Sequence, residues 1–197
     1  MASTTTHLLY LHGFRSSPQS TKAQRMAEWV AAQRPDIVWR CPQQPMSPRA
    51  AMQLIEGLTA DWPTDAMAVI GSSLGGFYAG VLAQRRGCAA LLLNPAVHPA
   101  RDLKGQVGAT TAWHGGEPLV FEPHYVDELR ALEPLRLSRP ERCFAVIAKG
   151  DEVLDWREMT GAIKGARIKL LEASDHAISD FDDHLPEVLR FLDLAPD

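Results

Sequence analysis

Short runs of apolar residues alternate along the chain with longer segments whose apolar residues recur at helical spacing. This alternation is typical of a parallel β-sheet whose strands are joined by crossover helices. Several of the short runs are apolar throughout, as expected for strands that are buried on both faces. Six strands are predicted, at Leu8–Leu11, Ile37–Arg40, Ala66–Ile70, Ala89–Leu93, Cys143–Ala148 and Arg167–Leu171.

Apolar residues at positions i, i+3, i+4 and i+7 predict amphipathic helices between these strands. The first such helix includes Ala23 and is ended by Pro35, and a second follows Ser47, an N-cap with proline after it. A last helix carries its apolar stripe between Phe181 and Leu192. We therefore predict an α/β fold, with six mostly parallel strands in the order 2-1-3-4-5-6 and helices on both faces.

Residues 94–122 do not follow this pattern, because they contain several glycines and prolines and no sustained period. Loops of this length in compact domains often cover a binding site. Trp113 and Phe121 could supply an apolar wall for such a site, so we predict an irregular, lid-like insertion that lines it. The alternative is a surface insertion without a role.

Length and composition limit the possible functions. The 197 residues fit one domain, 1–197, and a net charge of −4 without a basic stripe argues against a nucleic-acid surface. The three cysteines are far apart, which indicates neither a disulfide framework nor a metal site and fits a reducing cytoplasm. The longest apolar run has six residues, so no membrane span or signal peptide is predicted.

A G-x-S-x-G sequence, Gly71 to Gly75, stands directly between a predicted strand and a helical segment. In this context the motif is a nucleophile elbow, a tight turn that presents a serine hydroxyl at the carboxyl edge of the sheet. The register of the motif selects Ser73 over Ser72 as the nucleophile. A glycine-rich turn with a capping serine is the structural alternative.

A serine nucleophile needs an imidazole base, and the base needs a carboxylate that holds its tautomer. Asp151 and His176 follow the fifth and sixth predicted strands, in the chain order that this fold uses. Both should therefore lie at the same sheet edge as Ser73. Asp155 is the rival acid, although its place at the start of a helix suits a dipole partner.

Three other residues near the predicted site are given structural roles. Asp175 adjoins His176 but should point away from it, and Asn94 lies where an acid could stand but carries only a neutral amide. His12 should hydrogen-bond within the turn after the first strand. Two backbone N–H groups would stabilise an oxyanion, one from Leu74 after the nucleophile and one from Phe14 after the first strand.

Several segments resemble a known family: L-Y-L-H-G-F-R-S-S-P-Q-S-T-K-A-Q, G-S-S-L-G-G-F-Y-A, L-N-P-A-V, G-D-E-V-L-D and S-D-H-A-I. Together they resemble the small bacterial YqiA-type esterases of the α/β-hydrolase superfamily. The resemblance runs nearly end to end and is weakest between Arg101 and Phe121. Where the family often has glycine before the Asp–His pair, this chain has Ser174.

The resemblance implies a minimal α/β-hydrolase fold that lacks the two leading strands of the superfamily. It also implies a serine esterase that acts on short- to medium-chain esters, with acyl thioesters as a further substrate type, and that uses no cofactor. It carries Ser73, Asp151 and His176 over as a catalytic triad, and Phe14 and Leu74 as oxyanion donors. The expected partner is a small-molecule ester. The alternatives are a peptidase or acyltransferase with the same triad, or a catalytically idle binding module of the same fold.

Overall fold

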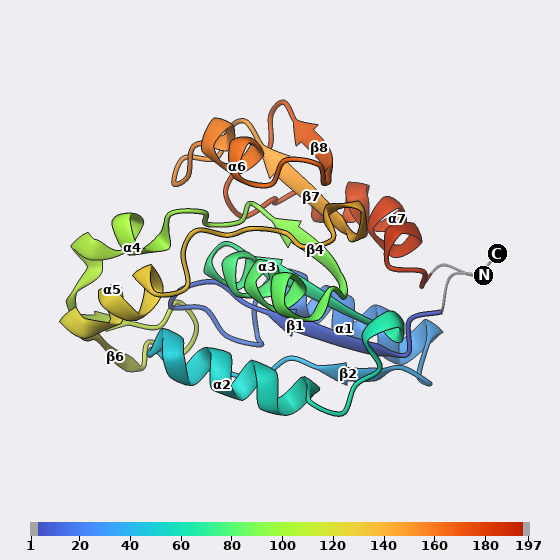
Figure 1. Ribbon diagram of the computed structural model, residues 1–197, viewed down its shortest axis with the longest axis horizontal. Coiled ribbons are helices and arrows are strands. Elements are labelled where there is room, and N and C mark those ends of the chain that lie inside the picture. The colour runs from blue at the N-terminus through green and yellow to red at the C-terminus, as the bar shows by residue number, and fades with distance from the viewer. Residues whose placement is uncertain (1–3, 195–197) are drawn as a thin grey trace.

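The computed structural model describes residues 4–194, so the first and last three residues of the predicted domain 1–197 lie outside the described residues. Its main sheet has six strands, and all five pairings between them are parallel (Figure 1). The strands are, in spatial order, β2 (Val38–Arg40), β1 (His7–Leu11), β3 (Met67–Ser72), β4 (Ala89–Leu93), β7 (Cys143–Ala148) and β8 (Arg167–Leu171). The predicted order 2-1-3-4-5-6 is confirmed, with β7 and β8 as the fifth and sixth strands.

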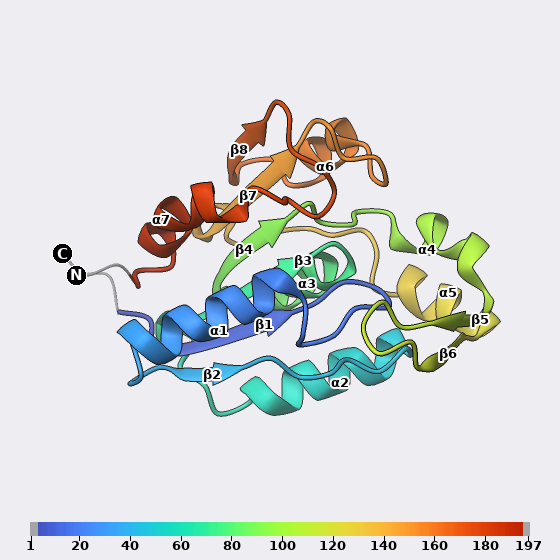
Figure 2. The ribbon, with the colours of Figure 1, turned by 180° about the vertical axis from the view of Figure 1, so that it is seen from behind.

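Helices cover both faces of this sheet because successive strand residues point to opposite sides. Along β1, Leu8 and Tyr10 pack toward one face, with α1 and α7, while Leu9 and Leu11 pack toward the other. Figure 2 shows α1 and α7 in front of the sheet, on the face opposite α2 and α3. The helices are α1 (Thr21–Gln33), α2 (Pro48–Thr59), α3 (Leu74–Arg86), α4 (Pro99–Asp102), α5 (Pro123–Arg130), α6 (Trp156–Ala162) and α7 (Phe181–Phe191).

The segment 94–122 is more regular than the sequence predicts. After α4 it forms an antiparallel hairpin of β5 (Gly108–Thr111) and β6 (Pro118–Phe121). The turn between these strands contains Gly115 and Gly116, both at positive φ. This glycine pair between two short runs is the hairpin signal in the sequence. The strands themselves give a weak signal, because only Phe121 at the end of β6 is buried.

Candidate active site

Ser73 lies in the turn between β3 and α3, with φ 56° and ψ −119°, which is an uncommon conformation for a residue with a side chain. The glycines on either side allow this turn. A Cβ at Gly71 would lie 2.1 Å from the carbonyl oxygen of Gly75, and one at Gly75 would lie 2.1 Å from that of Leu11. The small residues of the motif therefore serve close backbone packing, which exposes the serine at the carboxyl edge of the sheet.

The structure brings Ser73, His176 and Asp151 together from three loops at this edge. The Nε2 of His176 lies 3.1 Å from the Oγ of Ser73, and its Nδ1 lies 2.8 Å from Oδ2 of Asp151. The Asp151 side chain is fully buried, and its Oδ1 accepts hydrogen bonds of 2.8 Å from two backbone N–H groups, those of Val153 and Leu154. These bonds fix the carboxylate so that one oxygen faces the imidazole.

The rival acids have other partners. Asp155 caps α6 by accepting a hydrogen bond from the backbone N–H of Arg157. Asp175 accepts two hydrogen bonds from Ser179, one from its backbone and one from its hydroxyl, and these hold the pKa of the Asp175 carboxyl below its usual range. Neither carboxylate contacts the imidazole of His176. Of the three acids Asp151, Asp155 and Asp175, only Asp151 lies within hydrogen-bond distance of the imidazole.

His12 is a buried residue of the turn after β1. Its Nε2 accepts a hydrogen bond of 3.2 Å from the backbone N–H of Gln44, so its Nδ1 carries the proton and donates it to the carbonyl of Gly13, 3.0 Å away. Burial lowers the pKa of His12, which favours this neutral form. The structure therefore gives His12 the turn-stabilising contacts that the sequence predicts.

The loop after His12 passes directly against Ser73. A Cβ at Gly13 would lie 3.3 Å from the Cβ of Ser73, so a side chain there would crowd the Ser73 hydroxyl. In the described part of the chain, the N–H groups of Phe14 and Leu74 donate to no protein acceptor. Both residues line a small pocket of about 40 Å³ on one side of this loop. Phe14 alone of the two also lines the larger cavity beside Ser73.

Asn94 is the residue near the site whose importance the sequence does not reveal. Its side chain is completely buried, and its Oδ1 accepts a hydrogen bond of 2.8 Å from the N–H of Ala148 at the end of β7. Its Nδ2 donates to the carbonyls of Asp175 and His176, each at 3.0 Å. One amide therefore joins the ends of β4 and β7 to the loop that carries His176. Its position at the end of a strand was the available signal, but its partners depend on the tertiary structure.

Trp113 and Phe121, the two predicted substrate-contacting residues, lie in different environments. Trp113 is 67% exposed and lines the large cavity, with the guanidinium of Arg15 stacked 4.1 Å from its ring centroid. Phe121 is fully buried and packs edge-on against Phe14, with ring centroids 5.3 Å apart. The prediction that Phe121 lines the substrate site is therefore wrong: its ring is part of the core beneath the loop after β1 and lies outside the cavity lining.

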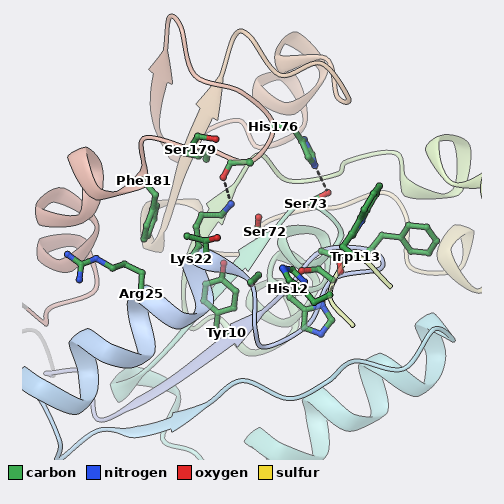
Figure 3. A pocket seen from close by; sticks show the side chains of 18 of the residues that line it. Tyr10, His12, Lys22, Arg25, Ser72, Ser73, Trp113, His176, Ser179 and Phe181 are labelled. Atoms are coloured by element: carbon green, nitrogen blue, oxygen red, sulfur yellow. Dashed lines mark hydrogen bonds between the residues drawn. The ribbon is translucent and has the colours of Figure 1, made fainter. Parts of the chain in front are cut away.

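A cavity of about 450 Å³ opens beside Ser73 and His176, and Figure 3 shows it between α1 and the loop that carries His176. Its walls come from the loop after β1, from α1, from the turn of the hairpin and from the segment that leads into α7. It is lined by Tyr10, His12, Gly13, Phe14, Ser16, Ser20, Thr21, Lys22, Arg25, Ser72, Ser73, Trp113, His114, His176, Ala177, Ile178, Ser179, Phe181 and Asp182.

Within residues 4–194, no three His, Cys, Asp or Glu side chains are gathered so that they could hold a metal ion. None of the helices in the same range combines the length and the apolar character that crossing a membrane requires.

The three thiols are protonated, because burial raises the pKa of Cys41 and Cys143 to about 12 and that of Cys88 to about 11.

Comparison with solved structures identifies the class of fold. The chain matches the mouse protein called alpha/beta hydrolase domain-containing protein 10 with a TM-score of 0.68 and 14% identity, over 95% of this chain and 92% of that one. It matches a structure from a study of the metagenome-derived lipolytic enzymes LipS and LipT with a TM-score of 0.70 and 17% identity, over 97% and 95% of the two chains. The fold is that of the α/β-hydrolases.

Within this class, the chain belongs to the uncharacterised protein family UPF0227, whose sequence profile matches residues 7–193. A UPF0227 protein of Shewanella sp. strain ANA-3 is 24% identical over 191 residues, which cover 93% of this chain and 98% of the relative. The match therefore extends over nearly the whole of both proteins. It includes all the loops that carry the candidate site.

Proposed function

We propose that the chain is a serine esterase that hydrolyses short- to medium-chain carboxylic esters through an acyl-enzyme on Ser73. The observation that carries the proposal is the position of His176, whose two ring nitrogens lie within hydrogen-bond distance of Ser73 and Asp151. This is the arrangement that activates a serine for acyl transfer. The likeness to lipolytic enzymes supports the choice of reaction.

In the acylation step, Nε2 of His176 takes the proton of the Ser73 hydroxyl while Oγ attacks the ester carbonyl. The tetrahedral intermediate carries its negative charge on the former carbonyl oxygen, where the N–H groups of Phe14 and Leu74 would donate to it. Asp151 stabilises the imidazolium that forms. Collapse of the intermediate expels the alcohol, which receives the proton from His176, and leaves the acyl group on Ser73.

In the deacylation step, His176 accepts a proton from water as the water oxygen attacks the acyl-enzyme. A second tetrahedral intermediate forms in the same oxyanion site. It breaks the bond to Oγ of Ser73, which recovers its proton from His176, and the carboxylic acid is released. The same steps apply to an acyl thioester, for which the first leaving group is a thiol.

A panel of p-nitrophenyl esters with increasing acyl length tests the proposal. The wild-type protein should hydrolyse the short and medium esters with water as the only acceptor, and Ser73→Ala should lower kcat by up to about 10⁶-fold because the acyl-enzyme route is lost. Ser72→Ala is the matched control and should cost far less. No turnover of any ester by the folded wild type, or equal losses in the two variants, would contradict the proposal.

A further inference from the structure

The large cavity beside Ser73 contains a lysine that forms no salt bridge within the described residues. Two cations, Lys22 and Arg25, enter its lining from α1. Arg25 is neutralised, because its Nε donates to the Asp182 carboxylate over 2.6 Å at the mouth of the cavity. Lys22 forms no salt bridge with any carboxylate of residues 4–194, and its ammonium donates instead to the backbone carbonyl of Ala177.

Lys22 is half-buried, so keeping its ammonium charged without a salt bridge costs free energy. Burial lowers the pKa of its ammonium to about 8, while the nearby negative charge of Asp175 acts in the opposite direction. Asp175 already accepts two hydrogen bonds from Ser179, at 2.9 and 2.6 Å. An ammonium has three donors, and the carbonyl of Ala177 uses one of them. The others are free for a ligand in the cavity.

The N-terminus of α1 adds to the positive electrostatic potential in the cavity near Lys22. Helix N-termini expose N–H groups that favour an anion, and acidic residues in the first turn usually supply one. The first turn of α1 has no acidic residue, and the side chain of its N-cap, Ser20, does not accept a backbone hydrogen bond. The Oγ of Ser20 is buried and makes no hydrogen bond of good geometry. Ser20 and Thr21 line the same cavity as Lys22.

We infer that Lys22 binds a carboxylate carried by the substrate, so that the enzyme prefers negatively charged esters to neutral esters of the same shape. The inference rests on the proposed ester hydrolysis at Ser73. Asp182 forms a salt bridge with Arg25, so Lys22 is the lysine or arginine of the lining that remains free to pair with a carboxylate of the substrate. Figure 3 shows the Lys22 ammonium and the Tyr10 hydroxyl on the same side of the cavity as Ser72.

A purely structural role for Lys22 predicts a different result. Its bond to Ala177 holds the residue that follows His176, so loss of the lysine could simply loosen the loop of the base. Such an effect would slow the hydrolysis of charged and neutral esters alike. Recognition of a carboxylate instead changes the ratio of kcat/KM between the two kinds of ester.

Matched ester pairs measure this ratio. Ethyl hydrogen glutarate and ethyl glutaramate differ in a carboxylate or amide on the acyl side, and 4-acetoxybenzoate and 4-acetoxybenzamide differ in the same way on the leaving-group side. We expect a preference of at least about tenfold for the charged member of one pair, since hydrogen bonds between charged groups are strong. The pair that shows it tells which part of the substrate faces Lys22.

Three variants assign the preference to Lys22. Lys22→Gln should reduce it by at least about tenfold, and Lys22→Arg should retain most of it because the charge is kept. Lys164→Gln removes an exposed lysine of the turn before β8, outside the cavity lining, and should leave the preference unchanged. Equal losses on both members of a pair in Lys22→Gln would overturn the inference and leave the structural role.

A pH profile of the wild type tests the same point without a variant. The carboxylate of the substrate stays ionised above pH 6, whereas Lys22 loses its proton as pH rises through its pKa of about 8. The preference should therefore be full at pH 6.5 and decline toward pH 9.5. The groups around Lys22 are Asp175, the Arg25–Asp182 pair, His176 and Tyr10. The preference is the ratio of kcat/KM for the charged ester to kcat/KM for the neutral ester, so the effect of these groups on the chemical step cancels.

The outcomes separate this inference from the proposed function. Hydrolysis of neutral esters that depends on Ser73, with no preference for charge or with a preference that does not change with pH, rejects the carboxylate site alone. Absence of hydrolysis for all four esters rejects both. A preference that falls in Lys22→Gln and above pH 8 supports both.

Discussion

The two sides of the candidate site are held in place by different means. On one side, at the ends of buried parallel strands, the imidazole of His176 lies 2.8 Å from Asp151 and its backbone carbonyl accepts a hydrogen bond of 3.0 Å from Asn94. On the other, the β5–β6 hairpin is anchored by the buried ring of Phe121 and by Arg15, while Trp113 at its turn is 67% exposed. The hydrogen bonds of the first side hold His176 and Asp151 in place, whereas the exposed turn of the hairpin around Trp113 can change without disturbing them. Variants on the first side should therefore impair all esters, and variants at the hairpin turn should change which ester is preferred.

The largest effect among these variants is expected at Asp151. In Asp151→Asn, the N–H groups of Val153 and Leu154 would hold the amide oxygen where Oδ1 now lies, and the new NH₂ would face Nδ1 of His176. The imidazole would then carry its proton on Nε2 and could not accept the proton of Ser73. We expect kcat to fall by roughly 10⁴-fold for every ester.

Asp155→Asn is the control for this change, because it alters an acid four residues away that caps α6 and pairs with the side chain of Arg157. It should stay within about tenfold of wild-type activity. Steady-state kinetics of the two variants decide between the acids. A larger loss in Asp155→Asn would move the catalytic acid to that residue.

Asn94→Ala should have the next largest effect. It leaves the N–H of Ala148 and two carbonyls without their partner, in a region where each unpaired buried group costs about 1–3 kcal/mol. The His176 loop also loses its connection to β4. We expect a lower Tm and a fall in kcat of about 10- to 100-fold, equal for short and medium esters. Unchanged kcat in the folded variant would show that the loop is held by its other contacts.

Arg15→Ala tests the connection between the β5–β6 hairpin and the loop after β1. Arg15 directly follows Phe14, the proposed oxyanion donor, in the sequence. Its Nε donates a hydrogen bond of 2.6 Å to the carbonyl of Thr111 in β5. Losing this bond should misplace the Phe14 N–H and lower kcat about tenfold for all esters, less than the roughly 10²- to 10³-fold cost of deleting an oxyanion donor. Arg15→Lys should recover only part of the loss, because lysine lacks the planar fork. A change confined to long esters would instead assign Arg15 to substrate binding.

The smallest effect is expected at Trp113, and it should be one of selectivity. Each buried methylene of an acyl chain contributes about 0.8 kcal/mol, so an apolar wall matters more for longer chains. Trp113→Ala should change the ratio of kcat/KM between short and medium esters several-fold. Val120→Ala, at a half-exposed position on the same hairpin, should leave the ratio unchanged. An unaltered ratio in Trp113→Ala would reduce the hairpin turn to a surface feature.

Much of the fold could be predicted because its strands are buried on both faces. The runs at β3, β4 and β7 are apolar almost throughout, and their parallel pairing puts the loops after them at one edge. The elbow at Ser73 and the loops of Asp151 and His176 follow from that arrangement. The structure brings together all three of these side chains.

The features that the sequence did not reveal depend on contacts between distant residues. Lys22 meets Ala177 across 155 residues, and Asn94 meets His176 across 82, so no local pattern could show either contact. Phe121 was misassigned because an aromatic residue near a site can face either the cavity or the core. The hairpin was missed because small residues and glycines carry little periodic signal.

The most direct test of the central claim is to locate the reactive serine by mass spectrometry. The folded wild type is treated with a fluorophosphonate, which forms a covalent bond with an activated serine, and the peptide that spans Ser72 and Ser73 is fragmented. We predict one adduct per chain on Oγ of Ser73, retained in Ser72→Ala and absent in Ser73→Ala. An adduct on another residue, or labelling that persists in Ser73→Ala, would contradict the assignment of Ser73 as the nucleophile.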